Sequence, residues 1–204
     1  MKMKRFLVVV DAQNDFMQPY GALSIKGADL VIDKINDFLY STSKDSYVGA
    51  LFTFDTHRMP EYMGSEEAKM FPPHCIEDTK GWGLAVSTLM LNYRIPQYTL
   101  KKGVFDMWAE EDLYLENQYG AKIHRDGFFG NLLYEKEVTE VDVIGVALNF
   151  CVKYAVDGLI ARGFKVNLYA NCTKGIDTGN GVLDTDPALV FKSYIESGQL
   201  TVVV

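Results

Sequence analysis

Short apolar runs bounded by Gly, Pro, Asn, Asp and Ser alternate with helical patterns along most of the chain. Runs of this length that are rich in Val, Ile, Leu, Phe and Tyr predict buried β-strands. Apolar strands separated by helices are typical of a parallel sheet that is covered on both faces. We therefore expect a three-layer α/β fold with a parallel sheet of about six strands, in one domain over residues 1–204. The predicted strands are residues 7–10, 47–54, 97–100, 141–146, 164–170 and 200–204.

Helices are predicted where apolar side chains recur every three or four residues. The clearest helix follows Asp29 and carries Leu30, Ile32, Ile35, Phe38 and Leu39. Another begins near Asn149, whose side chain suits an N-cap, and ends at Gly163, since glycine adopts the left-handed C-terminal conformation without strain. A further helix starts at residues 185–188, where Pro187 suits the first turn. Shorter helices are expected at residues 84–91, 108–119 and 131–136, with a turn at 126–130.

Composition narrows the classes of function. With 204 residues and 48% hydrophobic content, the chain can fill one core. The net charge of −7 argues against nucleic acid or anionic membranes as partners, because both attract basic surfaces. No apolar run is long enough to span a membrane, and the first run meets Asp11 too early for a signal peptide. Three cysteines are too few for a disulfide framework, so we expect a cytoplasmic protein.

Polar side chains follow the ends of four predicted strands. The carboxyl ends of parallel strands open on the same edge of a sheet, and ligands bind in the crevice there. A carboxylate, a lysine, a thiol and an Asp-x-His pair are therefore expected to meet at one rim. These residues are Asp11, Asp55, His57, Lys101, Lys102 and Cys151.

Cys151 is expected in the first turn of the helix that begins near Asn149. Unpaired N–H groups and the positive end of the helix dipole favour a thiolate there, and a thiolate is a nucleophile. A cysteine in this position is more often an inert apolar residue. The polar groups expected at the same rim favour the nucleophile.

A long loop, residues 55–83, carries a candidate metal site. Loops of this length in a compact domain are usually functional or disordered. Asp55, His57 and His74 offer a carboxylate and two imidazoles, a set suited to Zn²⁺, with Fe²⁺ and Mn²⁺ as alternatives. Either Glu66 or Glu67 could supply a fourth ligand. A lone histidine is more often a surface residue, which is how we interpret His124.

Five segments of the chain resemble the motifs of one enzyme family. On these motifs, the chain resembles the isochorismatase-like cysteine hydrolases over residues 5–175, and among them the nicotinamidases. The resemblance implies a Rossmann-like three-layer fold and amide hydrolysis. The segments are Asp11-Ala-Gln-Asn-Asp-Phe16, Phe54-Asp55-Thr-His57, Phe71-Pro-Pro-His74, Lys102-Gly-Val-Phe105 and Gly145-Val-Ala-Leu-Asn-Phe-Cys151.

The resemblance also implies a role for each matching residue. The catalytic residues would be Asp11, Lys102 and Cys151. Lys102 is preferred to Lys101 because it directly precedes Gly103, and neighbours on a strand point to opposite faces. The oxyanion hole would use the backbone N–H groups of Ala147 and Cys151, and the peptide bond Val146–Ala147 would be cis.

The resemblance extends to the metal and the substrate. The metal ligands would be Asp55, His57, His74 and Glu67, and the substrate contacts would be Phe16, Phe71, Phe105, Val146 and Ala147. The implied substrate is a small amide such as nicotinamide, cleaved to nicotinate and ammonia through a cysteine thioester. Family members also form homo-oligomers. The chain departs from the family at residues 106–137, and at Leu148 and Asn149, where Thr and Asp are more usual.

Three other functions remain open from the sequence. The chain could be a cysteine amidohydrolase of the same fold that acts on a carbamoyl or ureido substrate, for which no metal anchor is needed. It could be a small-ligand-binding protein without catalysis, in which case Cys151 would be unreactive. A metal-dependent hydrolase that uses bound water would leave Asp11 and Lys102 without a role.

Overall fold

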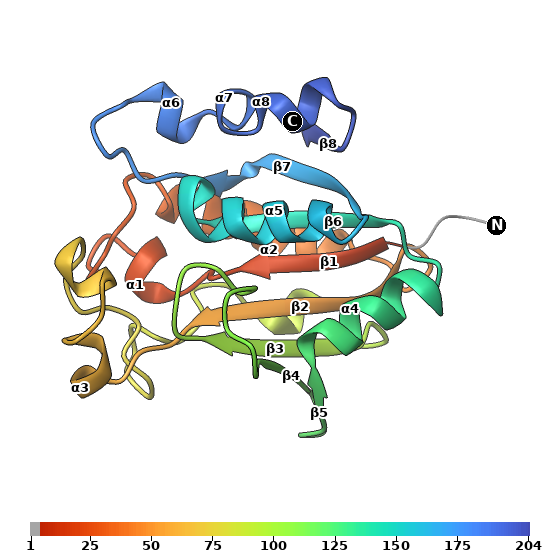
Figure 1. Ribbon diagram of the computed structural model, residues 1–204, viewed down its shortest axis with the longest axis horizontal. Coiled ribbons are helices and arrows are strands. Elements are labelled where there is room, and N and C mark those ends of the chain that lie inside the picture. Colours follow the sequence, from red (N-terminus) through yellow and green to blue (C-terminus); the bar gives the residue numbers. More distant parts are fainter. Residues whose placement is uncertain (1–4) are drawn as a thin grey trace.

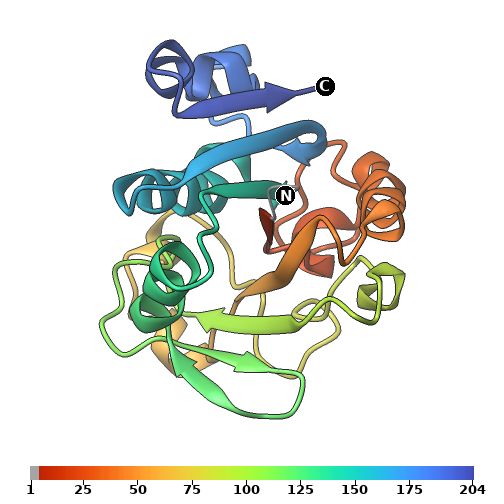
Figure 2. The ribbon, with the colours of Figure 1, turned by 90° about the vertical axis from the view of Figure 1, so that its right-hand side faces the viewer.

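Eight strands form one sheet in the computed structural model, which describes residues 5–204 (Figure 1, Figure 2). Their order across the sheet is β5-β4-β3-β2-β1-β6-β7-β8. Each predicted strand is present, so the α/β fold is confirmed, but two strands were missed. The strands are β1 Arg5–Val10, β2 Tyr47–Asp55, β3 Gln97–Lys102, β4 Tyr114–Asn117, β5 Lys122–His124, β6 Glu140–Val146, β7 Lys165–Lys174 and β8 Leu200–Val203.

The central strands are apolar throughout because both faces of the sheet are covered. On β1, Phe6 and Val8 pack in one core cluster, whereas Leu7 and Val9 pack in the other. Successive side chains of a strand point to opposite faces, so these two clusters are the two sides of the sheet. Six neighbouring strands of the sheet run parallel: β3, β2, β1, β6, β7 and β8. An antiparallel hairpin of β4 and β5 extends the edge at β3.

Helices cover both faces, as the pattern of the sequence predicted. Helices α4 (Arg125–Tyr134) and α5 (Lys153–Ala161) contribute to one core cluster, and α2 (Ile32–Ser41) contributes to the other (Figure 2). Within residues 5–204, no helix has the length and apolar character that crossing a membrane requires. The shorter helices are α1 Asn14–Met17, α3 Met59–Tyr62, α6 Val182–Thr185, α7 Pro187–Val190 and α8 Lys192–Glu196.

Two predicted helix boundaries agree closely with the structure. Helix α5 is followed by Gly163 in the left-handed region, with φ of 94°. Helix α7 begins at Pro187, and the Asp186 side chain caps it by accepting a hydrogen bond from Ala188 N. Leu30 was wrongly assigned to the buried face, since it is 71% exposed before α2 begins. The helix predicted at 84–91 was wrong apart from one 3₁₀ turn, Thr88–Met90.

The connection between β3 and β6 differs most from the prediction. The helix predicted at 108–119 was wrong, because its second half is β4, where side chains alternate between exposed and buried. The turn predicted at 126–130 was also wrong, because this stretch lies inside α4. Its glycines are typical of a turn, but Phe128 and Phe129 are buried in the core. Tertiary packing therefore overrides the local preference.

Trp108 anchors this connection to α5. Its indole lies against Gly158, where an added Cβ would come within 2.1 Å of the ring, so only glycine fits. The Arg162 guanidinium lies 3.8 Å from the ring centroid, a distance at which a cation–π contact stabilises the pair. Helix α5 begins just after Cys151. The segment that departs from the family motifs is thus packed on the helix that follows the candidate nucleophile.

Candidate active site

The candidate site lies at the carboxyl edge of the sheet. Figure 1 shows β1, β2 and β3 ending on the same side, next to α1 and α3. Asp11 follows β1, while Asp55 and Lys102 are the last residues of β2 and β3. Cys151 follows β6, within a π-helix, Leu148–Val152, that leads into α5. Parallel strand order thus gathers four side chains that are far apart in the sequence.

Lys102 lies at the centre of this group. Its Nζ atom is 2.8 Å from Asp11 Oδ2, 3.1 Å from Asp55 Oδ1 and 3.5 Å from Cys151 Sγ. All four side chains are buried, and Cys151 keeps 5% of its surface exposed. The structure therefore places two carboxylates and a thiol within contact distance of one ammonium group.

The charges of this group decide the resting state of the thiol. Burial lowers the pKa of Lys102, but Asp11 and Asp55 outweigh it and raise that pKa well above its ordinary value. Burial raises the pKa of Cys151 well above its ordinary value, and Lys102 only partly offsets the burial and the two carboxylates. Burial and the two carboxylates thus oppose the expected thiolate, whereas Lys102 favours it. Asp11, which contacts the same ammonium group at 2.8 Å, is the candidate base for the thiol proton.

Lys101 is excluded from the group by the pleat of β3. Its side chain points to the opposite face, is 51% exposed, and pairs with Glu77 at 3.0 Å. The structure thus places Lys102, and not Lys101, beside Asp11.

Asn149 does not cap a helix, so that prediction was wrong. Its side chain instead donates to Ile176 O at 2.8 Å and accepts from Ile176 N at 2.9 Å. An aspartate at this position could only accept. The amide therefore ties the turn at Cys151 to the segment after β7 by two hydrogen bonds. In the same turn the peptide bond Val146–Ala147 is cis, as the resemblance implied.

Gly145 is required where β6 passes the end of β1. It has φ of 116°, and an added Cβ would lie 2.1 Å from Val10 O. A residue with a side chain would push β6 away from β1 at this point. The glycine thereby allows the turn carrying Cys151 to stay close to Asp11.

Four buried side chains form a group that could hold a metal ion. Their ligand atoms lie within 4.8 Å of one another, and they belong to Asp55, His57, Glu67 and His74. Glu67 is 6% exposed, whereas Glu66 points to solvent and pairs with Lys69. The structure thus decides between the two candidate glutamates in favour of Glu67.

The donor atoms of this group fit a divalent cation. His74 Nδ1 lies 2.8 Å from Pro72 O, which can only accept, so Nδ1 carries a proton. In the neutral ring, Nε2 then presents a lone pair to Asp55 Oδ2 at 3.1 Å and Glu67 Oε1 at 3.2 Å. Glu67 Oε1 is buried, and no hydrogen bond to it is found within residues 5–204. Lone pairs that converge in this way require positive charge between them.

The pKa shifts of His74 and Asp55 also reflect the negative charge of the carboxylates in this group. Burial lowers the pKa of His74, but the Asp55 and Glu67 carboxylates outweigh it and raise the pKa to about 10. For Asp55, burial raises the pKa, yet Lys102 and the two imidazoles bring it well below its usual range. Tyr62 supports the loop, donating its hydroxyl to Phe71 O at 2.9 Å.

Aromatic rings border the candidate site on the loop side. Phe16 lies 5.3 Å from His74, and Phe71 lies 5.9 Å from Phe105, between ring centroids. Sequence reasoning missed Phe150, whose ring is 5.4 Å from Phe105 and 5.6 Å from Phe71. Its position directly before Cys151 was the available signal. Half-buried rings that pack edge-on or tilted against one another form an apolar wall suited to a flat ligand.

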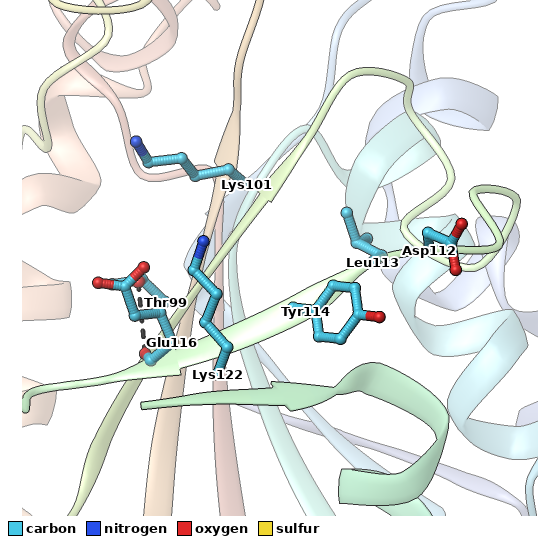
Figure 3. A pocket seen from close by; sticks show the side chains of 7 residues that line it. All are labelled: Thr99, Lys101, Asp112, Leu113, Tyr114, Glu116 and Lys122. Carbon is cyan, nitrogen blue, oxygen red and sulfur yellow. Dashed lines mark hydrogen bonds between the residues drawn. The ribbon is translucent and has the colours of Figure 1, made fainter. Parts of the chain in front are cut away.

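A separate pocket of about 210 Å³ lies at the antiparallel edge of the sheet (Figure 3). Lys101 lines it together with Glu116 and Lys122, so its charges have both signs. Both lysines are exposed, as is Glu116. The pocket is therefore not part of the buried group around Lys102.

Comparison with known proteins agrees with this site. The isochorismatase domain model matches residues 5–182. The chain belongs to the isochorismatase family. The isochorismatase match includes each of the side chains described around Lys102 and the candidate metal group.

Several relatives within the isochorismatase family have known names. The chain is 25% identical over 188 residues to the nicotinamidase/pyrazinamidase of Mycobacterium tuberculosis, covering 87% of this chain and 90% of that protein. It is 23% identical over 207 residues to the nicotinamidase of Saccharomyces cerevisiae, covering 87% and 91%. The pyrazinamidase of Pyrococcus horikoshii, solved in complex with zinc, has the same fold, with a TM-score of 0.69, 23% identity and 98% of each chain covered.

Proposed function

We propose that this isochorismatase-family protein is a nicotinamidase, which hydrolyses nicotinamide to nicotinate and ammonia through a thioester at Cys151. The observation that carries the proposal is the contact of Lys102 with both Asp11 and Cys151, beside the group of Asp55, His57, Glu67 and His74. The names of the relatives support the substrate, since four of them are called nicotinamidases.

In the first half of the reaction, Asp11 accepts the proton of the Cys151 thiol as the sulfur attacks the carboxamide carbon. Lys102 stabilises the charge on the sulfur while it forms. The carbonyl oxygen becomes an oxyanion, which the backbone N–H groups of Ala147 and Cys151 bind. Asp11 then gives its proton to the amide nitrogen, the C–N bond breaks, and ammonia leaves.

In the second half, water attacks the carbonyl carbon of the thioester. Asp11 accepts a proton from this water, and the same oxyanion hole holds the second tetrahedral intermediate. The C–S bond then breaks, Asp11 returns the proton to the sulfur of Cys151, and nicotinic acid leaves and loses its remaining proton to water as nicotinate. The thiol and the carboxylate are restored to their resting states.

Substrate binding uses the two remaining parts of the site. Phe16, Phe71 and Phe105 would pack against the ring, and Val146 and Ala147 would line the pocket beside the sulfur. Asp55, His57, Glu67 and His74 would hold a divalent cation, which we propose to be zinc, with iron and manganese as alternatives. When bound, the cation supplies a Lewis acid for the pyridine nitrogen, directly or through a water ligand.

The proposed function is tested by ammonia release from nicotinamide, pyrazinamide and a set of ureido compounds, with metal analysis on the same sample. We expect release from the two aromatic amides and about one divalent cation per chain. Release from the ureido compounds alone would identify a different amidohydrolase. A protein that releases no ammonia, and whose Cys151 iodoacetamide does not label, would be a binding protein.

Loss of the candidate metal group should act mainly on substrate binding. We expect His74→Ala to raise KM for nicotinamide about 10- to 100-fold, which corresponds to about 1.4 to 2.8 kcal/mol, with a smaller change in kcat. His124→Ala is the matched control, because that histidine contacts only Glu111 O at the antiparallel edge among the hydrogen bonds of residues 5–204. An unchanged KM in the His74 variant, or normal kinetics after metal removal, would contradict the anchoring role.

We further propose that the protein is cytoplasmic and forms a homo-oligomer. The three cysteines are free and buried, as expected in a reducing compartment. The oligomer is proposed from the resemblance to the family, and light scattering on the purified protein would measure the number of subunits.

A further inference from the structure

Asp11 has an uncommon backbone conformation for a residue other than glycine. Its φ is 43°, and its side chain is fully buried. A residue stays in this region only when its surroundings hold it there. The contacts that hold Asp11 therefore bear on any reaction in which its carboxylate takes part.

One hydroxyl group contacts both the backbone and the side chain of Asp11. Thr53 Oγ1 accepts a hydrogen bond from Asp11 N at 3.1 Å and donates one to Asp11 Oδ1 at 2.5 Å. Thr53 lies on β2, is itself fully buried, and has no other side-chain hydrogen bond within residues 5–204. A hydroxyl carries one proton and two lone pairs, so it can make both bonds at once.

This pair of bonds determines which carboxylate oxygen of Asp11 is directed toward Lys102. Oδ1 receives the Thr53 proton, while Oδ2 lies 2.8 Å from Lys102 Nζ, which is itself 3.5 Å from Cys151 Sγ. Without the hydroxyl, rotation of the carboxylate would no longer be opposed on the Oδ1 side. Proton transfer depends steeply on the position and direction of the base.

We propose that Thr53 is a positioning residue for the reaction: its hydroxyl fixes the orientation of Asp11 so that Oδ2 accepts the proton of Cys151. This inference rests on the proposed cysteine mechanism. Thr53 does not touch the sulfur or the substrate in this arrangement, and it acts only through Asp11.

The test compares Thr53→Val, which keeps the shape and removes the hydroxyl, with Thr53→Ser, which keeps the hydroxyl. We expect kcat for nicotinamide to fall about 10- to 100-fold in Thr53→Val with KM unchanged, because groups that orient a reacting residue have effects of this size. Thr53→Ser should recover most of kcat. Thr42→Val is the matched control, since Thr42 also buries a hydroxyl bonded to backbone, to Leu39 O, after α2 and away from the site.

A second readout does not depend on nicotinamide. The rate of iodoacetamide labelling at Cys151, located by peptide mass spectrometry, should fall in Thr53→Val and recover in Thr53→Ser. If the unmodified protein releases no ammonia from nicotinamide, the proposed substrate is wrong, but this labelling comparison still decides the role of Thr53. Metal content and thermal stability of each variant are measured on the same samples.

The proposal is overturned if folded Thr53→Val shows wild-type kcat and labelling. It is also overturned if Thr53→Ser is as impaired as Thr53→Val, because the hydroxyl would then not be the active feature. If Thr53→Val does not fold, Thr53→Ala replaces it, since the smaller side chain introduces no clash. Equal kinetics of Thr53→Ala and Thr53→Ser would contradict the proposal in the same way.

Discussion

Cys151→Ala should abolish ammonia release from nicotinamide, with kcat lower by about 10⁴-fold or more, because removing a nucleophile removes the covalent route altogether. The sulfur is the atom that attacks the carboxamide, and no other thiol lies in the group around Lys102: Cys75 and Cys172 pack in the cluster on the other face of the sheet. Substrate binding should be retained, since the aromatic wall and the candidate metal group are unchanged. The rate is measured as ammonia released at saturating nicotinamide.

Cys172→Ala provides the matched control for this experiment. Its thiol is also buried, but it contacts Lys34 O on the α2 side of the sheet, so the variant should retain normal turnover. Retained turnover in Cys151→Ala would remove the thioester mechanism. A reaction that uses metal-bound water would then be the remaining hydrolytic route.

Lys102→Met should destabilise the metal-free protein by about 3 to 5 kcal/mol, because removing one partner of a buried ion pair leaves uncompensated charge. The ammonium group lies between Asp11 and Asp55, and all three side chains are at most 1% exposed. Methionine has a similar length and no charge, so the two carboxylates would lose their counter-ion. Urea unfolding measures this loss, and kcat should fall as well, since Lys102 also contacts Cys151 Sγ.

Lys101→Met controls for the loss of a lysine from β3. This neighbouring ammonium is half exposed and pairs with Glu77, so its removal should cost less than about 1 kcal/mol. Adding Asp11→Asn to Lys102→Met should restore part of the stability, because it removes one of the uncompensated charges. A Lys102→Met variant as stable as Lys101→Met would show that the buried charges are not coupled as described.

The local sequence predicts an element correctly where burial is the cause of both the apolar pattern and the element. The central parallel strands β1, β2 and β6 are largely apolar runs because both of their faces are buried, so their existence and order along the chain could be predicted. The antiparallel hairpin could not, because β4 is short, half exposed and acidic. Most of helix α4 was not predicted because its glycines favour a turn in isolation. Burial of Phe128, Phe129 and Leu132 in the core offsets that local preference, and it occurs only in the folded protein.

Some residues of the candidate site could also be predicted from the sequence, and others could not. Residue types at strand ends nominated Asp11, Cys151, the Asp55–His57 pair and one of two lysines as one group, and the resemblance to the family preferred Lys102. The role of Thr53 was not evident, although a threonine inside an otherwise apolar strand, two residues before Asp55 and on the same face, was a signal. Phe150 and the amide contacts of Asn149 depend on loops that approach from elsewhere in the chain, and no local pattern specifies such contacts.

The sequence by itself determined which strands end in chemically useful side chains, and therefore that a thiol, a carboxylate and a lysine share one edge of the sheet. The resemblance to the family preferred Lys102 to Lys101 and named Glu67. Only the tertiary structure showed that Lys102 and Glu67 are buried while Lys101 and Glu66 are exposed, and that burial opposes a thiolate at Cys151. Spacing along a strand determines the face of the sheet to which each side chain points. Burial and the balance of nearby charges arise only when distant segments pack together.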